Sequence, residues 1–180
     1  LMELPQSPEP LLSQLVIRPL EEPDLPALEW NGEFKHFRKV YENAYRRMQT
    51  GKLAAWVVTL PAEGVIGQIF VQYICDRPEL ANGTDRAYMY SIRVKPQFRG
   101  LGIGTVMMST VEEELVKRGI RTATLNVAKD NPRARQLYER LGFKVTAHEP
   151  GVWSYPDEKN VWHTVEQPAW RMEKVLVADS

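Results

Sequence analysis

The chain has 180 residues, of which 43% are hydrophobic and 26% charged, as expected for one globular domain with a sizeable core. Its 23 lysines and arginines balance 23 aspartates and glutamates, so it lacks the basic excess that a bulk grip on nucleic acid needs. A single cysteine, Cys75, excludes an intrachain disulfide and favours a reducing, cytoplasmic setting. No apolar run approaches the roughly 20 residues of a membrane helix, so a membrane is not expected as a partner. The balanced charge likewise argues against a nucleic acid as a partner.

The N-terminal half predicts a tail, two helices and a β-hairpin. Residues 1–14 are acidic and proline-rich, unlike a signal peptide, and are interpreted as a flexible tail before a domain that spans 15–177. Apolar spacing then predicts, in chain order, a strand at 15–20, a short helix at 24–30, a longer helix at 33–50, and an antiparallel pair of strands at 53–60 and 65–75.

The C-terminal half alternates strands and helices. The expected elements are a strand at 86–94, a helix from a glycine-rich turn to Gly119, a strand at 121–128, a helix opened by Asn131 and Pro132 and closed by Gly142, and two strands at 145–155 and 161–176. This order predicts an α/β fold with a mixed sheet.

The turn after residue 94, in VKPQFRGLGIGTVMM, places three glycines between a strand and a helix. Glycine is costly at a helix start unless the backbone must be bare there, and the first helical turn offers unpaired N–H groups with a partial positive charge. Arg99 adds a full charge beside Gly100, Gly102 and Gly104, so the turn predicts a site for a pyrophosphate. The alternative is a tight turn that binds nothing.

The spacing argues against two other phosphate-binding patterns. No lysine follows the last glycine, which makes a triphosphate P-loop a poor match. The glycines also do not fit G-x-G-x-x-G, and the preceding strand alternates polar and apolar residues, unlike the buried strand of a dinucleotide fold.

The segment IRVKPQFRGLGIGTVMM resembles the acetyl-CoA motif of the GNAT N-acetyltransferases, Arg/Gln-x-x-Gly-x-Gly/Ala. The block LNVAKDNPRARQLYERLGFK resembles the family's second signature, with Asn131, Tyr138 and a Leu-Gly-Phe ending. The resemblance covers 15–177 and implies a single-domain GNAT-type acyl-CoA N-acyltransferase fold. Its sheet is mixed and mostly antiparallel, and its fourth and fifth strands, here 86–94 and 121–128, splay apart to form a slot.

The resemblance also implies how acetyl-CoA, the cosubstrate, would be bound. The residues that would hold its pantetheine arm and pyrophosphate are Ile92, Arg93, Val94, Arg99, Gly100, Leu101, Gly102, Ile103, Gly104 and Thr105. Asn131 would bind the cofactor besides capping its helix. Tyr138 would protonate the departing thiolate as general acid, with a core tyrosine as the alternative. No metal is expected.

Some members of the family use a glutamate on the fourth or fifth strand as general base. Neither strand of this chain supplies such a carboxylate, and the polar candidates there are Ser91 and Asn126. A water chain past either residue is the preferred hypothesis, and Glu33, His148 and His163 are weaker candidates.

The acceptor pocket is expected between the loop that joins the first two helices and the last two strands, where the family binds its acceptors. Its candidate residues are Glu33, Phe34, Tyr90, Trp153 and Trp162. Aromatic faces can hold a cation or an apolar group, and core packing is the alternative for each tryptophan.

These features predict an N-acetyltransferase that moves the acetyl group of acetyl-CoA to a primary amine by direct attack in a ternary complex. One alternative is a non-catalytic module that binds acyl-CoA as a sensor or assembly subunit. Another is an enzyme with a different donor, such as succinyl-CoA. The resemblance is also compatible with a homodimer formed through the C-terminal strands.

Overall fold

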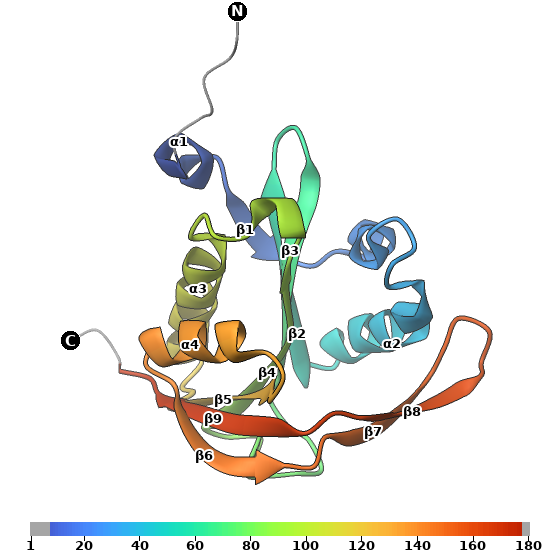
Figure 1. Ribbon diagram of the computed structural model, residues 1–180, viewed down its shortest axis with the longest axis vertical. Helices are drawn as coiled ribbons and strands as arrows, with labels where there is room; N and C mark the ends of the chain where they lie inside the picture. The colour runs from blue at the N-terminus through green and yellow to red at the C-terminus, as the bar shows by residue number, and fades with distance from the viewer. Residues whose placement is uncertain (1–7, 178–180) are drawn as a thin grey trace, which may run out of the picture.

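The computed structural model describes residues 8–177 (Figure 1). The helices are α1 (Pro8–Ser13), α2 (Arg38–Met48), α3 (Ile103–Lys117) and α4 (Pro132–Arg140), with short 3₁₀ helices η1 (Glu22–Glu29), η2 (Lys35–Phe37) and η3 (Pro96–Phe98). The strands are β1 (Val16–Pro19), β2 (Leu53–Leu60), β3 (Gly64–Gln72), β4 (Arg86–Val94), β5 (Thr122–Ala128), β6 (Lys144–Glu149), β7 (Val152–Pro156), β8 (Trp162–Glu166) and β9 (Ala169–Val175). None of these helices is both long and apolar enough to cross a membrane.

Seven strands form one mixed sheet in the order β1-β2-β3-β4-β5-β9-β6, and β7 and β8 form a separate two-stranded sheet. Every neighbouring pair is antiparallel except β4 and β5, which are parallel. A parallel pair needs a crossover between its strands, and α3 supplies it. The predicted fold class, a mixed and mostly antiparallel sheet in one α/β domain, is therefore confirmed.

The fourth and fifth strands part as predicted. Pairing between β4 and β5 joins Arg86–Met89 to Thr122–Leu125 and then stops, while β4 remains paired with β3 as far as Val94. A β-bulge coincides with this point, since the β3–β4 register shifts between Gln68 and Phe70. Within residues 8–177, the C-terminal half of β4 therefore has one edge without a strand partner.

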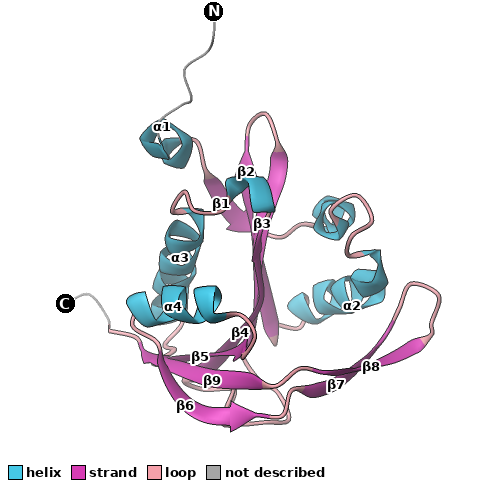
Figure 2. Ribbon diagram, viewed as in Figure 1, coloured by secondary structure: helices cyan, strands magenta, loops and turns pink. Residues whose placement is uncertain are grey.

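Helices cover both faces of the sheet (Figure 2). On one face α3 and α4 bury an apolar stripe that includes Met107, Val111 and Leu115 against the central strands. On the other face η1 and α2 bury Leu28 and Tyr41 in a second cluster. In α2 and α3 the buried residues follow the 3.6-residue spacing of an amphipathic helix.

Two expected boundaries were wrong. Residues 8–13 of the predicted tail form α1, whose Leu11 and Leu12 pack against the core; residues 1–7 of that tail lie outside the described residues. The strands expected at 145–155 and 161–176 are each divided, into β6 and β7 and into β8 and β9.

The division of the last strands has a physical cause. Pro150 and Pro168 lie in the two breaks and lack the N–H that a continuous ladder needs. Gly151 has φ of 69°, and a Cβ on it would lie 1.7 Å from the carbonyl oxygen of Gln167. The close approach of these two segments swings β7 and β8 out of the main sheet and toward α2.

Candidate active site

The glycine-rich turn presents bare backbone at the start of α3. Gly100 and Gly102 have φ of 76° and 86°, a left-handed conformation that glycine adopts without strain. Gly102 is the N-cap residue of α3, and no side chain caps it. The first intrahelical bond runs from the Val106 N–H to the Gly102 carbonyl at 3.1 Å, so the amides of the first turn, at 103–105, have no acceptor within the helix.

Two arginines approach this turn from different elements. The Nε of Arg99 donates a hydrogen bond to the Val94 carbonyl at 2.9 Å, which folds the exposed side chain back along the loop. Arg133, on α4, was not predicted. A Cβ on Gly100 would lie 3.8 Å from its Nη2. The turn therefore combines unpaired amides, a helix N-terminus and two guanidinium groups, which together favour an anion.

The slot lies directly beside the turn. Ile92 and Val94 pack their side chains on the core that α3 covers, and Arg93 points to the opposite face of the sheet, where it contacts α2. Because β5 has already parted from β4, the backbone of 90–94 has no strand partner on that side among the residues that the structure describes. Such groups require other hydrogen-bond partners, and an extended amide-containing chain could provide them.

Tyr138 is buried beneath α4, with 8% of its surface exposed. Its ring packs edge to face with Phe143 at 6.0 Å. Burial raises the pKa of Tyr138 to about 12, because the phenolate is disfavoured away from water. The hydroxyl is therefore a proton donor at neutral pH. Asn131 caps α4, since its Oδ1 accepts the Ala134 N–H at 3.2 Å.

The two residues proposed for a proton path differ in their surroundings. Ser91 is in the bulge with φ of 50°, and its hydroxyl accepts hydrogen bonds from Gln68 Nε2 at 2.8 Å and Arg93 Nη1 at 3.1 Å. Asn126 comes one position after the last residue of β5 that pairs with β4, where the two strands part. Its Oδ1 is buried and has no hydrogen-bond partner among residues 8–177. Asn126 thus offers an open acceptor, whereas Ser91 is engaged.

Two tyrosines of β4 point to the same face as Asn126. Tyr88 and Tyr90 stack at 5.7 Å, and Tyr90 also packs against Phe70. Burial raises the pKa of Tyr88 to about 12 and also raises the pKa of Tyr90. Both hydroxyls therefore remain protonated at neutral pH.

An aromatic cluster of Phe34, His36, Phe37, Trp153 and Tyr155 joins η2 to β7. Phe37 is its centre, with Phe34 at 6.2 Å, Trp153 at 5.9 Å and Tyr155 at 5.0 Å between ring centroids. Trp153 is 42% exposed. The structure thus brings two predicted pocket residues, Phe34 and Trp153, together through Phe37.

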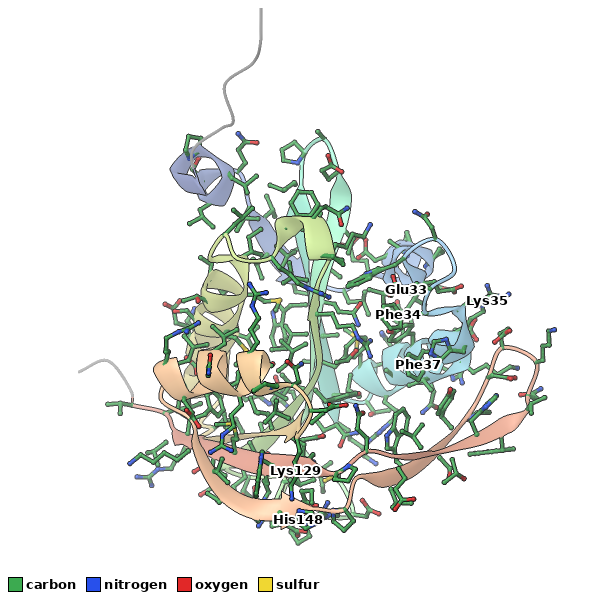
Figure 3. The ribbon with its side chains drawn as sticks, in the orientation of Figure 1. Glu33, Phe34, Lys35, Phe37, Lys129 and His148 are labelled. Atoms are coloured by element: carbon green, nitrogen blue, oxygen red, sulfur yellow. The ribbon has the colours of Figure 1, made fainter. Side chains whose placement is uncertain are left out.

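Other predicted residues are placed elsewhere. Trp162 is 69% exposed and pairs with Pro156, on the face of the β7–β8 hairpin opposite to Tyr155. Glu33 is exposed on the loop beside Phe34 (Figure 3). His148 packs edge to face with Trp170 at 6.3 Å, near Lys129 and away from Glu33 and Phe37 in Figure 3.

Several other polar groups of the C-terminal strands are paired. Glu149, on β6, is 4% exposed and accepts two hydrogen bonds from Arg77 at 2.9 Å and one from Arg171 at 3.2 Å. The Nε2 of His163 lies 2.7 Å from Asp157 Oδ2. Among residues 8–177 no three His, Cys, Asp or Glu side chains are arranged to hold a metal ion.

A family model described as "Acetyltransferase (GNAT) family" matches residues 10–143. The chain belongs to the GNAT acetyltransferase family. The matched segment includes both the glycine-rich turn and α4, so the family model and the geometry indicate the same region.

Curated relatives match part of this GNAT chain. The [Ribosomal protein bS18]-alanine N-acetyltransferase of Escherichia coli is 30% identical over 99 residues, which cover 55% of this chain and 53% of that protein. The chain thus spans about half the length of the curated relatives it matches.

Solved structures match over more of the chain. The Escherichia coli enzyme of the same name has a TM-score of 0.66 at 23% identity, covering 92% of this chain and 96% of its own. The spermidine/spermine N-acetyltransferase SpeG of Vibrio cholerae has a TM-score of 0.68 at 20% sequence identity, covering 91% of this chain and 94% of its own. Ard1 of Thermoplasma volcanium has a TM-score of 0.69 at 18% sequence identity, covering 92% of this chain and 99% of its own. At these identities the likenesses show the fold alone.

Sequence reasoning missed one residue of this GNAT site. Arg133 is an exposed arginine in a first helical turn, and nothing in its neighbours indicates contact with Gly100. Phe37 and Tyr155 lie within the two segments expected to contact the acceptor, but the sequence did not indicate that Phe37 is the centre of the aromatic cluster. The three-residue spacing of Phe34 and Phe37 places both rings on one helical face, and this spacing could have indicated that they belong to one cluster.

Proposed function

We propose that the protein is an acetyl-CoA-dependent N-acetyltransferase that acts on a primary amine by direct attack in a ternary complex. The observation that carries the proposal is the opening of β4 from β5 immediately before the glycine-capped start of α3. The names of the relatives, which acetylate an alanine amine or spermidine, support an amine as acceptor. The cytoplasmic setting and a homodimer stay predictions.

The residues present fit acetyl-CoA as the donor. The amides of 103–105 and the guanidinium groups of Arg99 and Arg133 would bind the pyrophosphate, because they supply donors and charge at one helix end. The unpaired edge of β4 at 92–94 would bind the pantetheine amides. When bound, the cosubstrate supplies an activated acetyl group.

Different groups at the slot would carry out the separate steps of the acetyl transfer. The Asn126 Oδ1 accepts an N–H of the amine, or a water that removes its proton, because it is a buried acceptor at the opening of the slot. A backbone N–H of the splayed half of β4 stabilises the oxyanion that develops on the acetyl carbonyl. Tyr138 donates its proton to the sulfur as the carbon–sulfur bond breaks.

Replacement of Tyr138 by Phe tests the proposal. Loss of a general acid lowers the rate by about 100-fold or more, so we expect kcat to fall by at least that factor. The dissociation constant for coenzyme A should stay the same, because the aromatic ring keeps its packing. Tyr45→Phe, on α2, is the matched control and should retain full activity.

Release of coenzyme A is measured over a panel of amino acids, polyamines, aminoglycosides and peptides. Unchanged release by Tyr138→Phe would remove that residue from the mechanism. Binding of coenzyme A without release from any acceptor would favour the non-catalytic module. A donor panel that includes succinyl-CoA tests the acyl preference. If calorimetry detects neither coenzyme A nor acetyl-CoA binding, the proposal and the binding module are both wrong.

A further inference from the structure

Arg93 extends from β4 toward η2 and α2, on the acceptor side of the sheet. Its guanidinium carbon lies 4.3 Å from the ring centroid of Phe34 and 5.5 Å from that of Phe37. Its Nη1 donates hydrogen bonds to Tyr41 Oη at 2.8 Å and to Ser91 Oγ at 3.1 Å. These contacts hold the guanidinium in one orientation beside the bulge.

The charge of Arg93 is not balanced by a neighbouring acid. No carboxylate among residues 8–177 lies within salt-bridge distance of it, whereas other arginines of this part of the chain, such as Arg18, Arg38 and Arg77, have such a partner. Its Nη2 and Nε donate to none of the described groups, and neither nitrogen is buried. Two donors of a rigid fork therefore remain available for an oxygen ligand.

Most acids around the aromatic cluster are engaged elsewhere or face solvent; the exception is Glu158 on the turn between β7 and β8, whose Oε2 is buried and has no hydrogen-bond partner among residues 8–177. Asp157 pairs with His163, and Glu29 pairs with Arg38 at 2.8 Å. Glu33 is exposed on its loop. The fork of Arg93 thus stands as an uncompensated positive charge beside the splayed half of β4, where an acceptor amine must enter.

We propose that Arg93 is a specificity-determining residue that binds a carboxylate of the acceptor, so that the preferred substrates are amines carrying a carboxylate near the amino group. The fork binds the two carboxylate oxygens, and the faces of Phe34 and Phe37 keep it oriented. This inference rests on the proposed function. It predicts that polyamines, which carry only positive charge, are poor acceptors.

Paired acceptors that differ only in one carboxylate test the proposal. Glycine is compared with glycinamide, and a C-terminally amidated peptide that begins with glutamate is compared with one that begins with glutamine. The first pair presents an α-carboxylate and the second a side-chain carboxylate, so the two arms distinguish a free amino acid from an acidic peptide. We expect kcat/KM to favour the carboxylate member of at least one pair by about 10- to 100-fold.

Arg93→Gln should reduce that preference to within about threefold of unity, mainly through KM, and Arg93→Lys should restore part of it. A bracing role for Arg93 toward Tyr41 would lower stability without changing the ratio between paired acceptors, so the ratio separates the two roles. Arg46→Gln, an exposed arginine of α2, is the matched control and should keep the full preference.

Calorimetry of the same pairs in the presence of coenzyme A gives a readout independent of turnover. If the protein binds the carboxylate members selectively but releases no coenzyme A, the proposed function is contradicted, whereas the role of Arg93 in carboxylate binding is supported. Two outcomes would overturn the inference: equal use and equal binding of the paired acceptors by the wild type, or a preference that survives in Arg93→Gln.

Discussion

Replacement of Gly102 by alanine should separate the ligand-binding role of the glycine-rich turn from its structural role. Gly102 has φ of 86°, and a Cβ built on it would meet only the Leu12 Cδ1, at 3.7 Å. That distance is an ordinary van der Waals contact, so the substitution creates no clash. The cost is the left-handed backbone, about 1 to 2 kcal/mol for a residue with a side chain. For a chain of this size, a loss of 1 kcal/mol lowers Tm by about 2–4 °C.

The effect on coenzyme A binding should be larger than the effect on stability. The added methyl group either stays at the surface that the phosphates approach, or it makes the turn relax and moves the amides of 103–105 out of alignment. Loss of one charge-assisted hydrogen bond costs about 1.5–3 kcal/mol, which is roughly a 10- to 100-fold increase in Kd. Calorimetric titration with coenzyme A measures Kd, and thermal unfolding measures the stability.

Gly119, which follows the C-terminal end of α3, provides the binding control, and Gly104, within α3, provides a control for stability alone. Gly119→Ala has a similar left-handed φ of 92° and open space around its Cβ, so it should lose similar stability and keep the wild-type Kd. Gly104→Ala has no positive φ and an ordinary contact with Leu137 at 3.8 Å, so it should keep or slightly raise Tm. If Gly102→Ala binds coenzyme A as tightly as Gly119→Ala does, the assignment of the turn to phosphate binding is refuted.

Three further predictions concern other parts of the molecule. Because burial raises the pKa of Tyr138 to about 12, the pH profile of kcat/KM should rise as the acceptor amine loses its proton and show no descending limb below about pH 10; a descending limb that Tyr138→Phe abolishes would contradict this assignment. Asp24 accepts two hydrogen bonds from Arg18, at 2.7 and 2.8 Å, so Asp24→Ala should lower the free energy of unfolding by about 2 kcal/mol at pH 7 in urea titrations. The Arg18 bond lowers the pKa of Asp24 below 3.8, so this stabilisation is present above that pH and is lost as the pH falls through the lowered value; a difference between wild type and variant that stays constant down to pH 2 would argue against it. Gly151→Ala should displace the β7–β8 hairpin, because its Cβ would overlap the Gln167 carbonyl, and should raise KM for the acceptor while leaving the Kd for coenzyme A unchanged; an unaltered acceptor KM in steady-state kinetics would count against a role for the hairpin.

The features that depend on neighbours along the chain could be predicted from sequence. The Asn131 cap on Ala134 spans three residues, and the strand, glycine turn and helix at 86–117 follow one another directly. Local conformational preference fixes such features, since a left-handed φ selects glycine and an unpaired helix start selects a capping side chain. The parting of the fourth and fifth strands was correctly expected only through the family resemblance.

The remaining features depend on contacts between segments distant in sequence. Arg133 reaches Gly100 only because α4 folds back over the turn, and Phe37 meets Trp153 only because the hairpin leaves the main sheet. The break at Gly151 illustrates the reason: a periodic pattern predicts one strand through 145–155, Pro150 and Gly151 permit a break there, and the close approach of the Gln167 carbonyl, sixteen positions along the chain, exists only in the folded structure. The sequence by itself thus determined the glycine-rich backbone that we propose as the phosphate site. Tertiary packing decided which side chains gather at the proposed acceptor site, because their neighbours come from different elements and no local periodicity records them.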